Sequence, residues 1–397
     1  MLNLKSLPIL LSRIMSGAAF YVIMPSILLV FSNRLDLSNS SAALWTGAII
    51  ILGRLVASPI GFILFKLNWK SVAIFGSVLS GCCSLTAYFE TQYDFIVLPL
   101  VLIAQSLGGV LTFISLRTGI ARCFAKEHHP TLFGNLHIAV NLGVALGPFV
   151  AVNLIEKNDF HNIFLLSATF QFLAAGILSR VKLNEVRQDE RQKNKSVKQS
   201  NIFLVSMFFL TFGTAGLIHQ FILVLEFFSL QKWASNEFAG MFFTGNAILV
   251  IFLMPFATKL LKKLSLKNLF LHAVTGAFLI PITFIGFSFI NDPIIAIVVL
   301  VVFLSISEVV LIPSQGALIP RFLSPKSYGN GFSILSMAQV LAYGVSTIFS
   351  SASLQLIENK NAQQYWIMVS LLFGLFILLS LLFGLYGFHK QLNKKIR

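Results

Sequence analysis

Charged residues are scarce in this 397-residue chain, and those of acidic sign are the scarcest. Only 11% of the residues are Asp, Glu, Lys or Arg, and 14 are acidic, whereas soluble proteins carry about 25% charged residues. Hydrophobic residues make up 56% of the chain, and the mean hydropathy is +0.85. This composition excludes an ordinary soluble protein and indicates an all-α polytopic membrane protein, in which each span uses about 20 apolar residues.

Cysteine and enzyme motifs are also nearly absent. Cys82, Cys83 and Cys123 show no Cys-x-x-Cys or Cys/His spacing, so we expect small packing residues and no metal site, disulfide or cofactor. A membrane enzyme or lipid-handling protein would need a catalytic cluster, and the chain contains no His-Glu-x-x-His, Gly-x-Ser-x-Gly, P-loop or paired aspartates. We therefore predict no catalytic residues and no enzymatic activity.

Apolar segments fill most of the chain. Twelve of them can be delimited, at 7–31, 41–65, 71–89, 95–120, 132–154, 161–179, 201–229, 237–258, 268–290, 294–318, 329–355 and 365–388. A polar stretch, 180–200, separates the sixth segment from the seventh and has no apolar periodicity. The sequence thus predicts a six-helix bundle over 1–179, a linker over 180–200 and a second six-helix bundle over 201–397.

The two predicted bundles resemble each other at a displacement near 196 residues. The matched positions are Gly17 with Gly213, Pro59 with Pro255, and the triplet beginning at Phe133 with the triplet beginning at Tyr328. Several matches at nearly one displacement indicate an internal duplication, as in transporters built from parallel repeats.

The formal net charge is +15, but the basic residues are distributed as in a membrane protein. With the spans above, 22 of the 29 Lys and Arg lie on one side, and only Arg34, Lys157, Lys232 and Lys360 lie on the other. This asymmetry predicts cytoplasmic termini by the positive-inside rule. We expect a bacterial cytoplasmic (inner) membrane protein that does not bind nucleic acid.

The most distinctive pattern lies in the fifth segment, which reads GNLHIAVNLGVALGPFVAV from Gly134 to Val152. Gly143 and Gly147 are four residues apart and share one helix face, where a neighbouring backbone can approach closely. Pro148 lacks the amide hydrogen that would bond to the carbonyl of Val144, so a kink is expected there.

This spacing of Gly134, Gly143 and Gly147-Pro148 resembles the fifth-helix signature of exporters in the major facilitator superfamily, although Ala151 and Val152 replace its usual closing glycines. The resemblance implies a major facilitator fold, with twelve helices in two pseudo-twofold bundles around a central cavity. It also implies a kinked fifth helix that packs against its counterpart and seals an antiporter against leak. The expected partners are a small-molecule substrate, protons and the lipid bilayer, and we expect a monomer.

Other signatures of that family are incomplete. The loop motif after the second helix corresponds to GFILFKLNWK, in which Gly61, Lys66 and Lys70 are kept while Phe65 replaces the acidic residue of a cytoplasmic latch. In the fourth helix Gln105 is kept, but Leu102 replaces an arginine that the family associates with proton coupling.

Three arginines fall within apolar segments, where a charged side chain costs at least about 2.5–3.5 kcal/mol at the bilayer centre. Arg54 shares a small, polar helix face with Gly47, Ser58 and Gly61, so we interpret it as lining a cavity or interface. Arg13 and Arg117 lie nearer the cytoplasmic ends of their segments, where both side chains can also extend to the surface. Binding is one reading for Arg13, and a gate contact is preferred for Arg117.

The second bundle carries acidic and titratable residues instead. Glu308 lies midway along the tenth segment among serines, and we select it as the candidate proton carrier because desolvation raises the pKa of a carboxyl group. Glu226 is a second candidate for proton coupling, although it can equally emerge at the outer surface. His219, two turns from Glu226, is deeper, and we note it because histidine is the side chain whose ordinary pKa lies near neutral pH.

The signs of these charges suggest the substrate. Arg54 and Arg13, with Gln105, Tyr21 and His219, form the predicted binding set, because arginine grips carboxylates bidentately. Gln105 and Tyr21 also have an ordinary alternative, in hydrogen bonding or packing between helices. The hypothesis is proton-coupled export of an anionic or zwitterionic organic solute such as a carboxylate metabolite or siderophore. The alternatives are a broad multidrug exporter, with Arg54 structural, and uptake of the same solutes.

Overall fold

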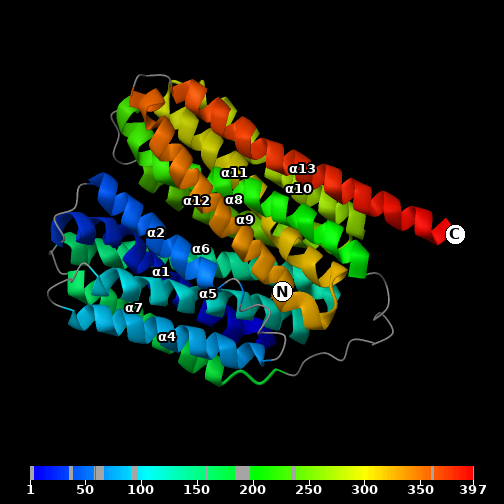
Figure 1. Cartoon of the computed structure of the whole chain (residues 1–397), viewed down its shortest axis with the longest axis horizontal. Coiled ribbons are helices and arrows are strands. Elements are labelled where there is room, and N and C mark those ends of the chain that lie inside the picture. Colours follow the sequence, from blue (N-terminus) through cyan, green and yellow to red (C-terminus); the bar gives the residue numbers. More distant parts are fainter. Residues whose placement is uncertain are drawn as a thin grey trace. The chain divides into compact units, whose positions relative to one another are not determined.

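The computed structural model describes residues 4–34, 39–57, 59, 67–90, 96–156, 160–183, 197–233, 238–358 and 362–396. These ranges contain helices and no strand (Figure 1). The α-helices are α1 (Leu7–Arg34), α2 (Asn39–Ala57), α4 (Trp69–Phe89), α5 (Val97–Cys123), α6 (His129–Glu156), α7 (Phe160–Ser179), α8 (Val197–Trp233), α9 (Phe238–Leu261), α10 (Leu266–Ser288), α11 (Pro293–Phe322), α12 (Tyr328–Glu358) and α13 (Ala362–Ile396). The 3-10 turns η2 (Lys126–His128) and η4 (Pro325–Ser327) precede α6 and α12.

The predicted all-α membrane fold is confirmed. Each of the twelve apolar segments coincides with one of these helices over the described part of the chain, although α13 continues to Ile396, beyond the predicted end at 388. Nine stretches of the described residues are long and apolar enough to cross a membrane, and Leu7–Ile23 and Trp45–Val56 are shorter apolar helical stretches.

Polar side chains define several helix ends. Asp292 accepts hydrogen bonds from the amides of Ile294 and Ile295, both at 2.9 Å, and Pro293 starts α11 where an amide hydrogen is not needed. Lys70 donates to the carbonyls of Ser179 (2.8 Å) and Val181 (2.7 Å) at the end of α7. These contacts satisfy backbone groups that a helix end leaves without partners.

The chain forms two compact units. Unit 1 comprises 1–125, 135–187 and 325–337, and unit 2 comprises 126–134, 188–324 and 338–397. Two short segments therefore group with the opposite half of the chain: the one that starts α6 belongs to unit 2, and the one that starts α12 belongs to unit 1. The division into bundles over 1–179 and 201–397 with a linker over 180–200 stays a prediction, and 184–196 lies outside the described residues.

Specific contacts hold both short segments. In unit 1, Arg122 Nε donates to the Pro325 carbonyl at 3.4 Å. In unit 2, the Phe133 ring packs on Gly316. A Cβ atom added to Gly316 would lie 2.6 Å from the Cγ atom of that ring. Burial lowers the pKa of Lys126 in η2, and the positive charge of Arg321 lowers it further. The two segments begin α6 and α12, which hold equivalent places in the two halves of the chain. Each half therefore contributes one short segment to the opposite unit, and we call this a reciprocal exchange.

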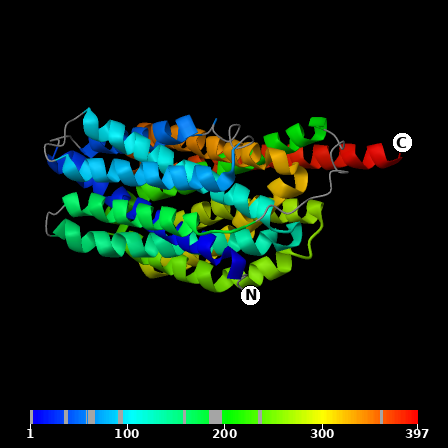
Figure 2. The same ribbon diagram turned by 90° about the horizontal axis from the view of Figure 1, so that it is seen from below.

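The helices pair in the same way in both units. In unit 1, α4 packs on α5 and α7, α1 packs on α7, and α2 packs on α5. In unit 2, α10 packs on α11 and α13, α8 packs on α13, and α9 packs on α11. Figures 1 and 2 show the neighbouring pair α4 and α7. This repeated pairing supports the duplication predicted from the sequence.

Glycines let two helices of unit 1 approach each other closely. A Cβ atom added to Gly108 of α5 would lie 2.5 Å from the carbonyl oxygen of Gly76 on α4. A Cβ atom added to Gly76 would lie 2.6 Å from the carbonyl oxygen of Gly108. Unit 2 has a related contact between α10 and α11, where Ser307 Oγ donates to the Gly276 carbonyl at 2.7 Å. Small residues let these backbones meet, which is how membrane helices gain packing energy.

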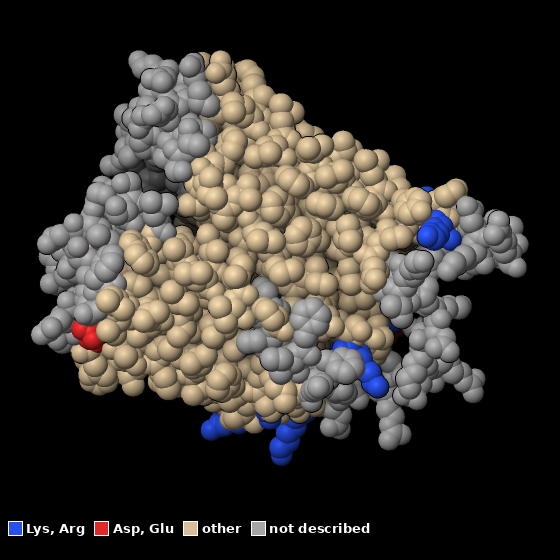
Figure 3. All heavy atoms as spheres, in the orientation of Figure 1, with Lys and Arg blue, Asp and Glu red and all other residues tan. Residues whose placement is uncertain are grey.

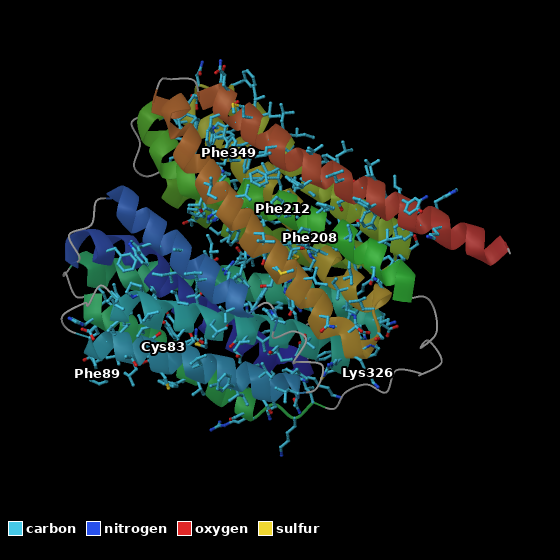
Figure 4. The ribbon with its side chains drawn as sticks, in the orientation of Figure 1. Cys83, Phe89, Phe208, Phe212, Lys326 and Phe349 are labelled. Carbon is cyan, nitrogen blue, oxygen red and sulfur yellow. The ribbon has the colours of Figure 1, made fainter. Side chains whose placement is uncertain are left out.

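The interiors of the units differ in composition. Unit 1 encloses an aliphatic and aromatic cluster that includes Val22, Ile49, Leu98 and Phe164. Unit 2 is richer in rings; Figure 4 labels Phe208 and Phe212, one turn apart on α8, whose rings stack at 6.2 Å. Aromatic pairs of this kind add about 0.5–1.5 kcal/mol beyond their area burial.

Large apolar side chains are also exposed, as expected for contact with lipid. Phe256, Ile294 and Ile348 are 75%, 72% and 71% exposed. On the face shown in Figure 3, the described charged side chains lie at the margins of a broad uncharged surface. Such a surface is stable in hydrocarbon and would aggregate in water.

Replacement of Gly108 by Ala is expected to destabilise the protein by about 1–3 kcal/mol, because the new methyl group meets the backbone of α4. Gly109→Ala is the matched control, since a Cβ atom there meets nothing within 4 Å. Thermal unfolding in detergent should show a lower Tm for Gly108→Ala only. Equal Tm values for the two variants would contradict the close contact of α4 with α5.

Candidate functional site

Two arginines of unit 1 lie against one aromatic ring. The Arg13 Cζ atom on α1 is 4.7 Å from the centroid of Phe113, and the Arg117 Cζ atom is 4.2 Å from the same centroid. Phe113 and Arg117 are four residues apart on α5, so they share a helix face. The negative face of the ring attracts each guanidinium group, and the two helices thereby hold two positive charges close together.

The hydrogen-bonding capacity of this pair is largely unused. Arg13 Nη1 donates to Ser16 Oγ at 3.4 Å. The Nε atoms of Arg13 and Arg117 are buried, and neither has a hydrogen-bond partner among the described residues. Cation–π contacts contribute about 0.5–2 kcal/mol each, less than the several kcal/mol that burial of an ion costs. The contacts with Phe113 therefore offset only part of that cost.

Arg54 belongs to the same positive region. Its Cζ atom lies 5.9 Å from the centroid of Phe20, and its charge is within electrostatic range of Arg13. Tyr21 also lies within range of Arg13, and its ring meets that of Phe20 edge to face at 5.2 Å. Unit 1 therefore gathers Arg13, Arg54 and Tyr21 from the predicted binding set.

Gln105 has a different environment. Its Nε2 atom donates to Ser84 Oγ at 2.9 Å and to Ser167 Oγ at 3.4 Å, and Ser167 Oγ donates to the Ala19 carbonyl at 2.9 Å. This buried network joins α5, α4, α7 and α1. The amide group of Gln105 is therefore engaged in linking helices, which was the ordinary alternative at the sequence level.

In unit 2, Glu308 lies in a polar network between α11 and α9. Asn246 Nδ2 donates to Glu308 Oε1 at 3.3 Å, and Ser305 Oγ donates to Asn246 Oδ1 at 2.7 Å. Ser305 thus orients the amide of Asn246 so that its NH₂ group faces the carboxylate. Glu308 is only partly buried.

His219 occupies a separate position in unit 2. Its ring stacks on Tyr343 with centroids 4.2 Å apart, and its Nε2 atom lies 3.4 Å from Thr347 Oγ1. These contacts link α8 to α12. The side chain of Glu226 and the whole of Gly61 lie outside the described part of the structure.

The fifth-segment motif lies on α6. A Cβ atom added to Gly143 would lie 2.8 Å from the amide nitrogen of Ala18. One added to Gly147 would lie 2.7 Å from the carbonyl carbon of Tyr21, so both glycines adjoin α1 in unit 1. A Cβ atom on Gly134 would lie 2.4 Å from Thr258 Cγ2 in unit 2. The helix continues through Pro148, whose side chain is not among those described.

Sequence reasoning missed Phe113, Asn246 and Tyr343. The spacing of Phe113 and Arg117 by four residues was a usable signal, because such residues meet on a helix. Asn246 is an isolated amide in a long apolar segment and could have been noticed in the same way as Glu308. Nothing local distinguishes Tyr343, because its ring meets His219 only through tertiary packing.

The sequence profile of the Major Facilitator Superfamily matches residues 9–347. The chain belongs to the major facilitator superfamily. The resemblance noted in the fifth segment is thereby confirmed, and so is the prediction of a transporter that is not an enzyme.

Individual relatives of this major facilitator chain are distant. Methyl viologen resistance protein SmvA, from two strains of Salmonella typhimurium, is 25% identical over 123 residues, which cover 31% of this chain and 24% of the relative. The chain thus matches about a quarter of the length of these relatives.

Solved structures show the same fold. The human organic anion transporter MFSD10 (TETRAN) aligns with a TM-score of 0.76 at 11% identity, over 96% of this chain and 100% of that one. A bacterial homologue of the iron transporter ferroportin in an outward-facing state aligns with a TM-score of 0.70 at 15% identity, over 97% and 99% of the two chains. At these identities the similarity establishes the major facilitator fold alone.

Gln105→Leu is expected to lower the stability of this major facilitator protein by about 0.6–1.7 kcal/mol, because it removes hydrogen bonds between helices. Thermal unfolding in detergent measures the change, and Gln363→Leu, at an exposed position, is the control. A Gln105→Leu protein with an unchanged Tm but lost substrate recognition would instead place Gln105 in the binding site.

Proposed function

We propose that this protein exports a small anionic or zwitterionic organic solute in exchange for protons. The observation that carries the proposal is the group of Arg13, Arg54 and Arg117 in unit 1, with two guanidinium groups on one ring. No ion pair among the described residues includes Arg13 or Arg117. A site with this charge favours carboxylates and disfavours lipophilic cations.

Outward transport is inferred from the fifth-helix motif. Gly134, Gly143 and Gly147 keep the spacing that resembles the signature of exporters. The proposed orientation places both termini in the cytoplasm of a bacterial cell, because most Lys and Arg then lie inside. Import of the same solutes would use the same site, but solute and protons would then move in the same direction.

Proton coupling is assigned to Glu308. Its carboxyl group lies within a membrane-spanning helix and receives a hydrogen bond from the neutral amide of Asn246. A carboxyl group at this place in a span is a functional-site candidate, because ionisable side chains within membranes commonly serve in proton relays. Glu226 stays the second candidate.

A broad multidrug exporter is the second proposal. Its support is the similarity to Methyl viologen resistance protein SmvA and the many rings of unit 2. In that case the arginines are structural, and aromatic surface binds the substrates. The organic anion transporter among the solved structures fits the first proposal, although its likeness concerns the fold.

The substrate class is tested in cells that lack the protein. Such cells are expected to retain acidic organic solutes, siderophores included, and expression of the natural chain should restore their release. Arg54→Ala should fail to restore it, whereas Arg180→Ala, which alters an exposed arginine, should succeed. Mass spectrometry of cell extracts and media gives the readout. Drug sensitivity without retention of any acidic solute would favour the multidrug reading instead.

The proton-coupling role is tested with Glu308→Gln in proteoliposomes that contain a pH-sensitive dye. The variant should exchange labelled solute, identified by the retention experiment, but should not move protons with it, because the amide cannot titrate. Glu127→Gln, at a residue whose side chain is 77% exposed, should behave as the natural protein does. Normal proton movement in Glu308→Gln would exclude Glu308 as the carrier.

A further inference from the structure

The pair of arginines on Phe113 has more positive charge than a single carboxylate neutralises. Arg13 approaches the ring from α1 and Arg117 from α5, at 4.7 and 4.2 Å from the centroid. Arg117 has no hydrogen bond or ion pair to the described residues. The Arg13 side chain donates only the long hydrogen bond to Ser16, and Tyr21 and Arg54 lie within electrostatic range of it. Both groups therefore keep donors for a ligand.

We propose that Arg13 and Arg117, which share the ring of Phe113, form a subsite for a doubly negative head group, either two neighbouring carboxylates or a phosphate monoester. This rests on the proposed transport of organic anions and assigns Arg117 to binding, where the sequence had favoured a gate contact. Arg54, over Phe20 and outside the shared ring, belongs to a neighbouring part of the same region.

The preference for two charges follows from electrostatics. With a monoanion bound, one guanidinium would stay uncompensated in surroundings where a lone buried charge is costly. A dianion can accept charge-assisted hydrogen bonds from both arginines, and each such bond contributes about 1.5–3 kcal/mol. Phe113 holds the two groups in place, so little conformational entropy is lost on binding.

The experiment measures the Tm of the purified full-length protein in detergent, near neutral pH, with pairs of probes matched in size. The pairs are succinate with butyrate and phthalate with benzoate, and phenyl phosphate is the third dianion. A ligand that binds only the folded state raises Tm with its concentration. We expect the dianions to act at concentrations about tenfold or more below those of the monoanions.

Variants assign the effect to the two arginines. Arg117→Gln and Arg13→Gln should each reduce the dianion response to the level of the monoanion. Arg117→Lys should keep part of it, because the charge is retained without the bidentate geometry. Arg180→Gln, at an exposed position, should leave the response unchanged. A dianion response that survives both Gln variants would overturn the proposal.

Measurements on the natural protein test the dianion subsite even where a variant fails to fold. Equal responses to the two members of each pair would overturn the dianion subsite while leaving anion transport intact. An absence of any anion response, together with stabilisation by a lipophilic cation such as tetraphenylphosphonium, would overturn both this proposal and the proposed function.

Discussion

Two uncompensated positive charges inside a helical membrane bundle are the constraint on which this account depends. Arg13 and Arg117 share the Phe113 ring and keep buried Nε atoms without partners in the described structure. Among the residues that the structure describes, no ion pair neutralises either side chain. Cation–π contacts offset part of this cost, and under the proposed function a bound anion offsets the remainder.

The rest of each unit explains how such a site is held in place. In unit 1, Gly76 and Gly108 bring α4 and α5 together, while Gln105, Ser84 and Ser167 connect the surrounding helices. In unit 2, the same helix pairing recurs, but the polar centre is Glu308 with Asn246 and Ser305. The repeated helix pairing thus carries buried arginines in unit 1 and a glutamate in unit 2, and the proposed exchange of an anion for protons is built on this difference.

Most of the fold could be predicted from the sequence, because apolar length and loop charge are local properties. Twelve segments and the duplication are visible in the order of residues alone, and the fifth-segment glycines pointed to the superfamily that the profile then established. The reciprocal exchange of 126–134 and 325–337 between units could not be predicted, because it depends on contacts such as Arg122 with Pro325. The candidate site was only partly predictable. The arginines were conspicuous as charges in apolar runs, whereas the shared ring of Phe113 depends on how α1 meets α5.

The most direct test of the central claim is to locate a heavy-atom-labelled dianion in crystals of the protein. Anomalous diffraction from crystals soaked in 4-bromophthalate should place the bromine beside Phe113, with the carboxylates of the ligand between Arg13 and Arg117. A bromine peak at a remote surface, or an acidic side chain found bound to both arginines, would contradict the account.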